Sequence, residues 1–276
     1  MGDTKGGPFE IDETTAQTLL ASLNPDGRDN ADVVRAWVNG LDLTRRPRRM
    51  WIIDFGVDMP IEEAALFEAP FEYVKRRVEP VREASKSTIS AWWLHERPRV
   101  EMRRALAGLS RYLLTPRVSK HRIFVWVHAE TLPDSAVIAI ARDDDYTFGV
   151  LHSRAHQLWA LAQGTQLETR PRYTPTTTFE TFPFPHATPE AMKVIGDTAA
   201  DLDRLRTGWL DPTGASPEEL ENRTLTKLYN QMPTWLQQAH QRLDRAVLDT
   251  YSFPSDLSDD DLLSRLLDLN LGREAV

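Results

Sequence analysis

The chain has 276 residues, of which 41% are hydrophobic and 27% are charged, as is typical of a globular protein with a buried core. It contains no cysteine, so disulfides and thiolate metal sites are excluded and a cytoplasmic location is expected. No apolar run approaches the roughly 20 residues of a membrane span, and the polar start is unlike a secretory signal, so no membrane partner is expected.

The net charge of −8 is unevenly distributed along the chain. Residues 186–276 carry 9 basic and 16 acidic residues, which leaves −1 for residues 1–185. Residues 97–123 contain eight positive residues and one negative residue. A second basic cluster comprises Arg45, Arg46, Arg48 and Arg49. Because arginine suits phosphates and guanine edges, these clusters favour a polyanionic partner, although each run alone is also compatible with an ordinary solvated surface.

The N-terminal part of the chain is predicted to combine helices with a strand. Residues 13–23 are typical of a helix, which the turn at residues 24–27 would end. The short apolar run at residues 50–55 predicts a strand. Residues 61–78 predict a helix with a kink near Pro70, because proline disrupts helical hydrogen bonding.

Three apolar runs in the middle of the chain predict further strands. Residues 123–127 and 136–141 are rich in β-branched residues, and the turn at residues 133–135 favours an antiparallel pair between them. Residues 146–151 predict another strand. This part of the chain should therefore contain an antiparallel sheet.

A helix and a long loop are predicted next. Ser153 is positioned to cap a helix that Gly164 would end. The apolar residues of this helix recur at helical spacing: Ala155, Leu158, Trp159 and Ala162. Residues 165–187 are rich in Thr, Pro and Arg and predict a long loop with short strands, a type of segment that often carries function.

The chain after Pro185 is predicted to be helical. Four helix starts are indicated, at residues 188–190, at a capping box over residues 216–219, at Pro233, and at Ser258 with Asp261. Gly272 predicts the end of the last helix. The sequence therefore predicts an α+β fold, with a mixed α/β domain containing antiparallel strands at residues 1–185 and a small all-helical domain at residues 186–276.

A cluster of acidic and histidine residues suggests a metal site, which we weigh against a simpler interpretation. Asp143, Asp144 and Asp145 precede His152 and His156, and the spacing of four places both histidines on one helix face. A metal site needs three or more converging ligands, and no HExxH motif is present. We therefore expect the aspartates on a turn, the histidines on a helix surface, and no metal. An enzyme with unfamiliar chemistry in this region remains an alternative.

The sequence contains no familiar catalytic motif. It has no P-loop, GxGxxG or GxSxG, no glycine-rich turn suited to S-adenosylmethionine, and no NPP-aromatic tetrapeptide. No catalytic residue is therefore assigned.

Two basic loops are the main candidates for ligand binding. Residues 115–122 present three cations and two hydroxyls beside a proline, which suits phosphate binding, and the alternative is a basic surface loop. Residues 170–178 combine arginine, tyrosine and threonine on a proline-stiffened loop that is suited to reading base edges. The alternative for the second loop is a structural lid.

Several segments resemble a known family. Four of them are similar to the recognition domain of MmeI-type (type IIL) restriction–modification enzymes: VVRAWVNGLDLTRRPRRMWIIDFG, RYLLTPRVSKHRIFVWV, IARDDDYTFGVLHSRAHQLWA and RYTPTTTFETFPFP. Two later ones resemble that family's C-terminal helical domain: TLTKLYNQMPTWLQQAHQRLDRAV and DLSDDDLLSRLLDLNL. Together these segments are spread along the chain from residue 33 to residue 271.

The resemblance implies a role in DNA recognition without chemistry of its own. Family members join a nuclease, a helical spacer, an amino-methyltransferase domain, the recognition domain and a helical tail, and they methylate adenine with S-adenosylmethionine. This sequence starts after the methyltransferase domain. The resemblance therefore implies no cofactor in this chain, no methylation or cleavage by the chain alone, and a methyltransferase domain in cis or in trans that holds S-adenosylmethionine.

The expected partner is double-stranded DNA. The expected DNA-binding residues are Arg45, Arg46, Arg48, Arg49, Arg117, Ser119, Lys120, Arg122, Glu168, Arg170, Arg172, Tyr173 and Thr176. Among them, the segment from Glu168 to Tyr173 matches the base-reading region of the family, and the basic loops would hold phosphates. A non-enzymatic protein-interaction fragment with an acidic helical binding surface is the alternative function.

Overall fold

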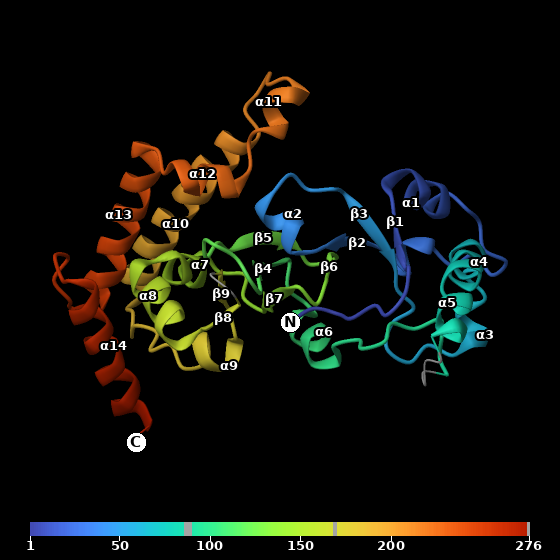
Figure 1. The fold of residues 1–276 in the computed structure, drawn as a ribbon, viewed down its shortest axis with the longest axis horizontal. Coiled ribbons are helices and arrows are strands. Elements are labelled where there is room, and N and C mark those ends of the chain that lie inside the picture. The colour runs from blue at the N-terminus through green and yellow to red at the C-terminus, as the bar shows by residue number, and fades with distance from the viewer. Residues whose placement is uncertain (86–89, 168–169, 275–276) are drawn as a thin grey trace. The chain divides into compact units, whose positions relative to one another are not determined.

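The computed structural model describes residues 1–85, 90–167 and 170–274, which form two compact units (Figure 1). Unit 1 consists of Met1–Asp42, Pro47–Leu114 and Val127–Ala141. Unit 2 consists of Leu43–Arg46, Thr115–Trp126 and Arg142–Val276. Residues 142–185 pack with the C-terminal helices in unit 2, and the expected domain boundary after residue 185 stays a prediction.

A four-stranded sheet forms the centre of unit 1. Its strands are β1 (Glu10–Ile11), β2 (Val34–Val38), β3 (Met50–Ile53) and β6 (Leu132–Pro133). The order is β1-β3-β2-β6, in which β3 is antiparallel to both neighbours and β2 is parallel to β6. Trp37, Ile52 and Ile53 are fully buried here, and the Trp37 indole donates to Glu10 Oε1 at 2.7 Å. The predicted strand at residues 50–55 is confirmed.

Short helices pack against this sheet. They are α1 (Glu13–Leu20), the 3-10 helix η1 (Asn30–Asp32), α3 (Ile61–Ala64), α4 (Glu68–Arg77), α5 (Glu79–Ala84) and α6 (Val100–Leu106). The helix predicted at residues 61–78 is interrupted between α3 and α4, before Pro70. Pro70 itself lies in the first turn of α4, where its missing N–H costs no helical hydrogen bond.

A second sheet has the strand order β5-β4-β7. Its members are β4 (Arg111–Pro116), β5 (Val125–His128) and β7 (Val137–Ile140). The predicted antiparallel pair between residues 123–127 and 136–141 is wrong, because β4 lies between these two strands. Five consecutive residues of β4, from Tyr112 to Pro116, are buried, as expected for a central strand. The chain passes from unit 1 to unit 2 within β4 and returns to unit 1 within β5. It also passes from unit 1 to unit 2 within α2 (Gly40–Thr44).

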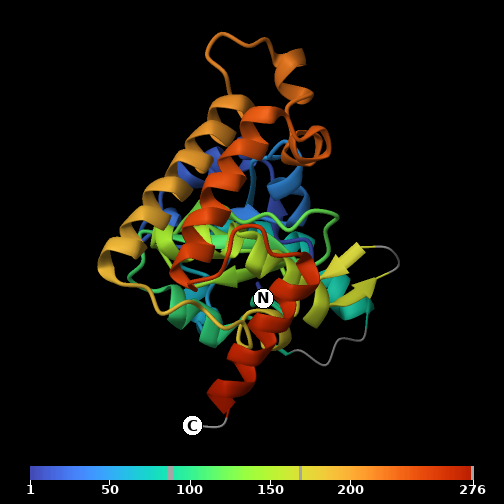
Figure 2. The same ribbon diagram turned by 90° about the vertical axis from the view of Figure 1, so that its left-hand side faces the viewer.

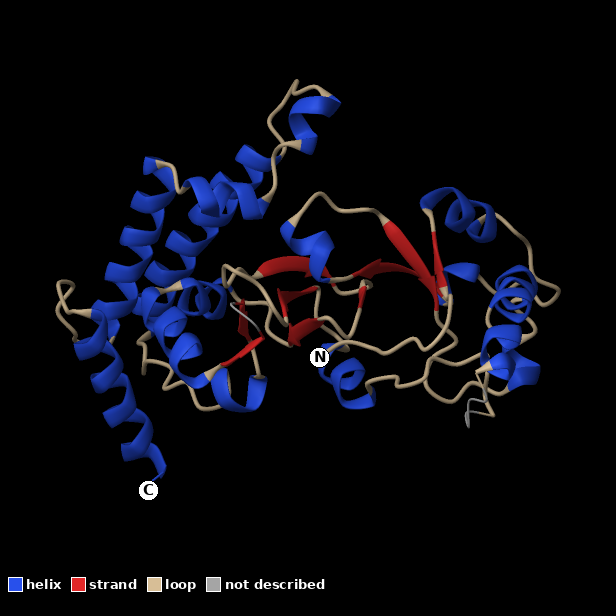
Figure 3. Cartoon of the chain, viewed as in Figure 1, coloured by secondary structure: helices blue, strands red, loops and turns tan. Residues whose placement is uncertain are grey.

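The N-terminal half of unit 2 contains α7 (Asp145–His152), α8 (Arg154–Gln163), β8 (Thr165–Leu167), β9 (Arg170–Arg172) and α9 (Pro175–Thr178). The predicted strand at residues 146–151 is wrong: Asp144 caps α7 by accepting from Thr147 N at 2.7 Å. The helix capped by Ser153 and ended by Gly164 is confirmed. Strands β8 and β9 form an antiparallel ribbon with Thr165 opposite Arg172 (Figure 3).

Five further helices, three of them long, lie in the described part of unit 2. They are α10 (Pro189–Leu210), α11 (Pro217–Glu221), α12 (Leu225–Gln231), α13 (Thr234–Thr250) and α14 (Asp259–Glu274). The predicted helix starts are confirmed, whereas Gly272 lies inside α14 and does not end it. Figure 2 shows α10 and α13 side by side, and α10 also packs on α7. A Cβ at Gly149 would lie only 2.7 Å from Ile195 Cγ2, so this glycine permits the close approach of α7 and α10.

The fold as a whole is α+β, as predicted. None of the helices in the ranges described above is long and apolar enough to cross a membrane.

Candidate nucleic-acid interface

The two basic loops predicted separately from the sequence adjoin in unit 2. Tyr173 N donates to Arg117 O at 2.8 Å, and Ser119 N donates to Pro171 O at 3.3 Å. An isolated antiparallel bridge joins Val118 to Arg172. The loop at residues 117–122, which is predicted to bind phosphate, is therefore fixed to the ribbon strand β9 by main-chain hydrogen bonds.

Arg122 connects the same two loops through its side chain. Its guanidinium donates to Thr115 Oγ1 at 2.9 Å and to the carbonyls of Pro116 and Pro171, and it lies 4.8 Å from the centroid of the Tyr173 ring. Burial lowers the pKa of Arg122 to about 10, which leaves it protonated at neutral pH. These bonds give Arg122 a positioning role in addition to its charge.

Lys120 and His121 extend from this loop toward α12. Lys120 Nζ donates to Asn230 Oδ1 at 2.6 Å, and His121 Nε2 lies 2.9 Å from the same oxygen. Lys120 is exposed, while Arg117 and Ser119 are partly buried. The loop therefore presents cations at the surface of unit 2 while it remains bound to the helical part.

The residues predicted to read bases separate into exposed and buried groups. Arg170, Arg172 and Thr176 are exposed, as base contacts require. Tyr173 is only 2% exposed, and its hydroxyl donates to His156 Nε2 at 3.0 Å. A side chain this buried has little surface for a base contact, and its hydrogen bond and packing support the loop, so base reading by Tyr173 stays a prediction. Glu168 lies outside the described residues.

The arginine cluster at residues 45–49 is divided between the units. In unit 2, Arg46 donates to Asp211 Oδ1 at 2.7 Å, and Arg45 is exposed. In unit 1, Arg48 forms a two-bond ion pair with Asp42, and Arg49 is exposed with a φ of 53°. Arg46 and Arg48 are therefore already neutralised by carboxylates, which leaves Arg45 and Arg49 as the better candidates for phosphate contacts.

The two histidines expected on a helix surface are instead completely buried. His152 Nε2 accepts from Phe124 N at 3.2 Å and from Arg206 Nη1 at 2.8 Å, so Nδ1 carries the proton and donates to Phe148 O. Both His152 and His156 are 0% exposed. The prediction of surface histidines is wrong. Because donors occupy Nε2 of His152 and Tyr173 occupies Nε2 of His156, neither histidine offers that nitrogen to a metal.

A second polar cluster, which the sequence did not indicate, lies in unit 1. Atoms of Asp3, Asp54 and His95 approach within 4.8 Å of one another and resemble a metal-ligand set. The guanidinium of Arg103 pairs with Asp3 and donates twice to Asp54, at 2.7 and 2.9 Å. Burial alone would raise the pKa of Asp54, but His95 and Arg103 lower it on balance. The arginine supplies the positive charge that a metal would otherwise bring.

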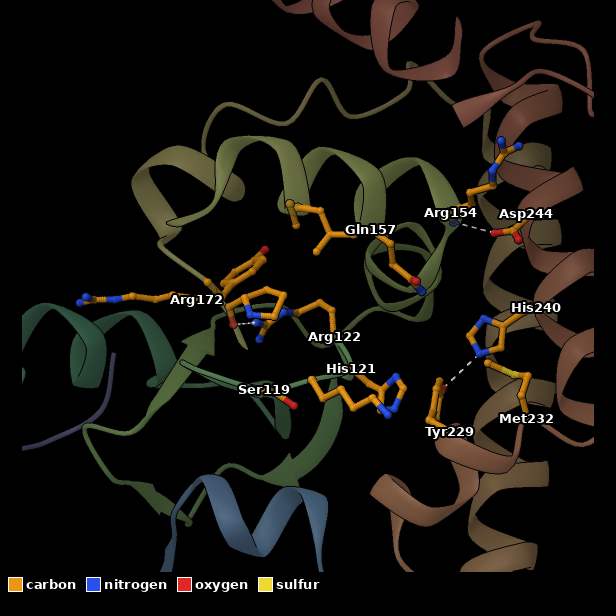
Figure 4. A pocket seen from close by; sticks show the side chains of 15 residues that line it. Ser119, His121, Arg122, Arg154, Gln157, Arg172, Tyr229, Met232, His240 and Asp244 are labelled. Atoms are coloured by element: carbon orange, nitrogen blue, oxygen red, sulfur yellow. Dashed lines mark hydrogen bonds between the residues drawn. The ribbon is translucent and has the colours of Figure 1, made fainter. Parts of the chain in front are cut away.

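A cavity of about 410 Å³ lies beside the basic loop within unit 2 (Figure 4). Ser119, Lys120, Arg122 and Arg172 contribute to its wall together with residues that the sequence did not indicate. These additional residues come from α8, α12 and α13, and they include Gln157, Tyr229, His240 and Asp244. Sequence reasoning could not find them, because they are scattered polar residues that three helices bring together.

Comparisons with known proteins identify the fold and the family. DNA methyltransferase A of Bacillus subtilis (strain 168) is 30% identical over 143 residues, which are 51% of this chain and 15% of that protein. A solved structure of the type IIL restriction–modification enzyme MmeI in complex with DNA matches 100% of this chain and 35% of that chain, with a TM-score of 0.72 and 21% identity. The chain thus spans a minor part of both proteins. The family model for the MmeI target recognition domain matches residues 4–186, so the chain belongs to this family.

Proposed function

We propose that this chain is the sequence-recognition module of an S-adenosylmethionine-dependent adenine-N6 DNA methyltransferase, with double-stranded DNA as its partner. The family match over residues 4–186 is the observation that carries this proposal. The chain corresponds to 35% of the MmeI chain and 15% of DNA methyltransferase A, so we assign cofactor binding and chemistry to a methyltransferase domain acting in cis or in trans. Such a domain would receive the target adenine flipped out of the duplex.

The geometry of unit 2 supports a division of labour between phosphate and base contacts. A two-stranded ribbon fits the major groove, and residues two apart on a strand share one face. Arg170 and Arg172 have this spacing on β9, and both are exposed. The loop at residues 117–120, fixed to β9, presents Lys120 alongside them. We assign base reading to β9 and its neighbour Glu168, and phosphate binding to the basic loop and Arg45.

Replacement of Lys120 and Arg45 by alanine should weaken duplex binding equally for all sequences. Each lost phosphate contact reduces the steepness of log affinity against log salt concentration by about 0.9. The slope of the double variant should therefore be shallower than that of the wild type by about 1.8. Fluorescence anisotropy at several salt concentrations measures this slope. The matched control is Lys193→Ala, which removes an exposed lysine paired with Asp197 on α10 and should leave the slope unchanged. An unchanged slope in the double variant would remove these residues from the interface.

Replacement of Arg172 by glutamine should alter specificity at one base pair. A bidentate arginine–guanine contact discriminates against the wrong base by about 1–3 kcal/mol. The full chain is supplied with the methyltransferase domain, and methylated sites are mapped by sequencing. The expected result is that Arg172→Gln accepts more than one base pair at one position of the recognised sequence. Lys120→Ala should instead reduce methylation at every recognised sequence alike. A uniform loss with Arg172→Gln would contradict base reading by this arginine.

A further inference from the structure

The cavity in unit 2 has a cationic side that carboxylates do not neutralise. Lys120 donates to the amide oxygen of Asn230, and Arg122 donates to a hydroxyl and to main-chain carbonyls. Within the part of the chain that the structure describes, neither cation forms an ion pair. Two positive charges held only by neutral acceptors favour an anionic group in the adjoining space.

The opposite side of the cavity presents hydrogen-bond acceptors (Figure 4). Gln157 Nε2 donates to His152 O at 3.0 Å, so the amide oxygen Oε1 remains as its acceptor. Asp244 Oδ1 accepts from Arg154 N at 2.7 Å, and the carboxylate lines the cavity. Burial raises the pKa of Asp244 to about 6, so it is mostly ionised at neutral pH. A carboxylate here repels phosphate and accepts hydrogen bonds from an amino group.

Aromatic and apolar side chains form the walls between these two sides. The rings of His121 and Tyr229 have centroids 6.0 Å apart, and those of Tyr229 and His240 are 5.6 Å apart. Leu161 and Met232 also line the space. Such walls suit a planar ring, and about 410 Å³ is within the usual size of small-molecule sites.

We propose that this cavity binds one unpaired nucleotide, with its phosphate at Lys120 and Arg122 and its base at Gln157 and Asp244. Because the base side offers acceptors, the base should carry an exocyclic amino group, as adenine and cytosine do and thymine does not. The site shares Lys120 and Arg172 with the proposed duplex interface but takes a different ligand, since a paired base has this amino group engaged with its partner strand. The nucleotide comes either from a free mononucleotide or from one extruded from a DNA strand.

Titration of the full chain with mononucleotides by isothermal calorimetry tests the proposal. The deoxynucleoside monophosphates of adenine and cytosine should bind about tenfold or more tightly than that of thymine, which places a carbonyl against the acceptors. Deoxyadenosine and inorganic phosphate should each bind more weakly than deoxyadenosine monophosphate. Equal affinity for the adenine and thymine nucleotides, or no binding of any of them, would overturn the proposal. This titration needs no duplex, so its failure is distinguishable from a failure of duplex recognition.

Variants of α8 locate the binding in the cavity. Gln157→Leu should abolish the preference for adenine over thymine, and Leu161→Trp should block binding by filling the space. Gln163→Leu and Ala162→Trp change exposed residues of the same helix outside the cavity and serve as matched controls. Thermal melting verifies that each variant is folded. Wild-type nucleotide binding by both folded cavity variants would contradict the assignment.

Duplexes distinguish the two sources of the nucleotide. If the ligand is extruded from DNA, a duplex with one unpaired adenosine should bind more tightly than the fully paired duplex, and deoxyadenosine monophosphate should compete for that gain. If the ligand is free, the mononucleotide should affect both duplexes to the same extent, because Lys120 also belongs to the proposed duplex interface. Both results support the site. If Leu161→Trp still binds the duplex with the unpaired adenosine more tightly than the paired duplex, the adenosine binds elsewhere and the proposal is overturned.

Discussion

Replacement of Arg103 by leucine is expected to destabilise unit 1 by about 3–5 kcal/mol, the usual cost of leaving a buried charge without its partner. Asp3 is fully buried and Asp54 is 4% exposed, and both carboxylates pair with this one guanidinium. Without the arginine, two buried carboxylates face each other beside His95, and Arg35 remains 3.6 Å from Asp54 only. Urea denaturation at pH 7 measures the loss of unfolding free energy.

The pH dependence separates this explanation from a simple loss of packing. In the wild-type protein the pKa values of Asp3 and Asp54 are lowered, so their stabilising contribution is complete above pH 3.8 and is lost as pH falls below it. In Arg103→Leu the same carboxyls should have raised pKa values, so the difference between variant and wild type should shrink from pH 7 to pH 5. The control, Arg104→Leu on the same helix, removes an exposed pair with Glu101 and should change stability by less than about 1 kcal/mol. A pH-independent difference would argue against charge burial.

Local signals in the sequence predicted the elements whose hydrogen bonds are local. Ser153 and Ser216 cap helices as expected, because each side chain accepts from an amide three residues later. The apolar stripe of α13, from Leu236 to Val247, is buried as its spacing indicates. Such patterns are readable because the interacting groups lie within one turn of each other.

Elements buried on every side were mispredicted because they lack periodicity. All six residues from Thr147 to His152 are buried in α7, so the run resembles a buried strand. Strand β4 was not predicted, because its buried residues lie within the basic run at residues 97–123. In both cases tertiary packing, and not local pattern, determines the structure.

The candidate site was predicted as two loops and found as part of a larger arrangement. The sequence indicated residues 115–122 and 170–178 but not their backbone pairing, which is a long-range contact. From the sequence, the charged residues were also expected at the surface. In the structure Arg103 is mostly buried and Arg206 is 2% exposed, and each lies within a polar network. The burial of Arg103 has no local signature, since its partners Asp3 and Asp54 are distant in the sequence. Arg206 has a near partner, Asp203, but its contact with His152 is also long-range.

Acidification from pH 7 to pH 5 is expected to destabilise unit 2 by about 4 kcal/mol. Burial lowers the pKa of His156 to about 3 and that of His240 to about 4, and it lowers the pKa of His152 strongly. The unfolded chain takes up protons at these histidines near pH 6.5 while the folded chain does not, so stability falls as pH decreases from 6.5. Asp244 acts in the opposite direction, because its pKa is raised to about 6. Its protonation in the folded state offsets the loss of stability from roughly one histidine.

A paired substitution tests the contribution of His156; besides the bond with Tyr173, it removes the hydrogen bond from His156 Nδ1 to Leu151 O. His156→Leu with Tyr173→Phe removes both partners of the buried hydrogen bond, which is far less costly than removing one. Urea denaturation between pH 7 and pH 5 should then show a dependence on pH that is smaller by about 1.4 kcal/mol per pH unit below pH 6. His128→Asn is the matched control, because the His128 side chain is 71% exposed and should not alter this dependence. If the paired variant keeps the wild-type dependence, His156 is not held neutral by burial, and the acid sensitivity must come from other groups in unit 2.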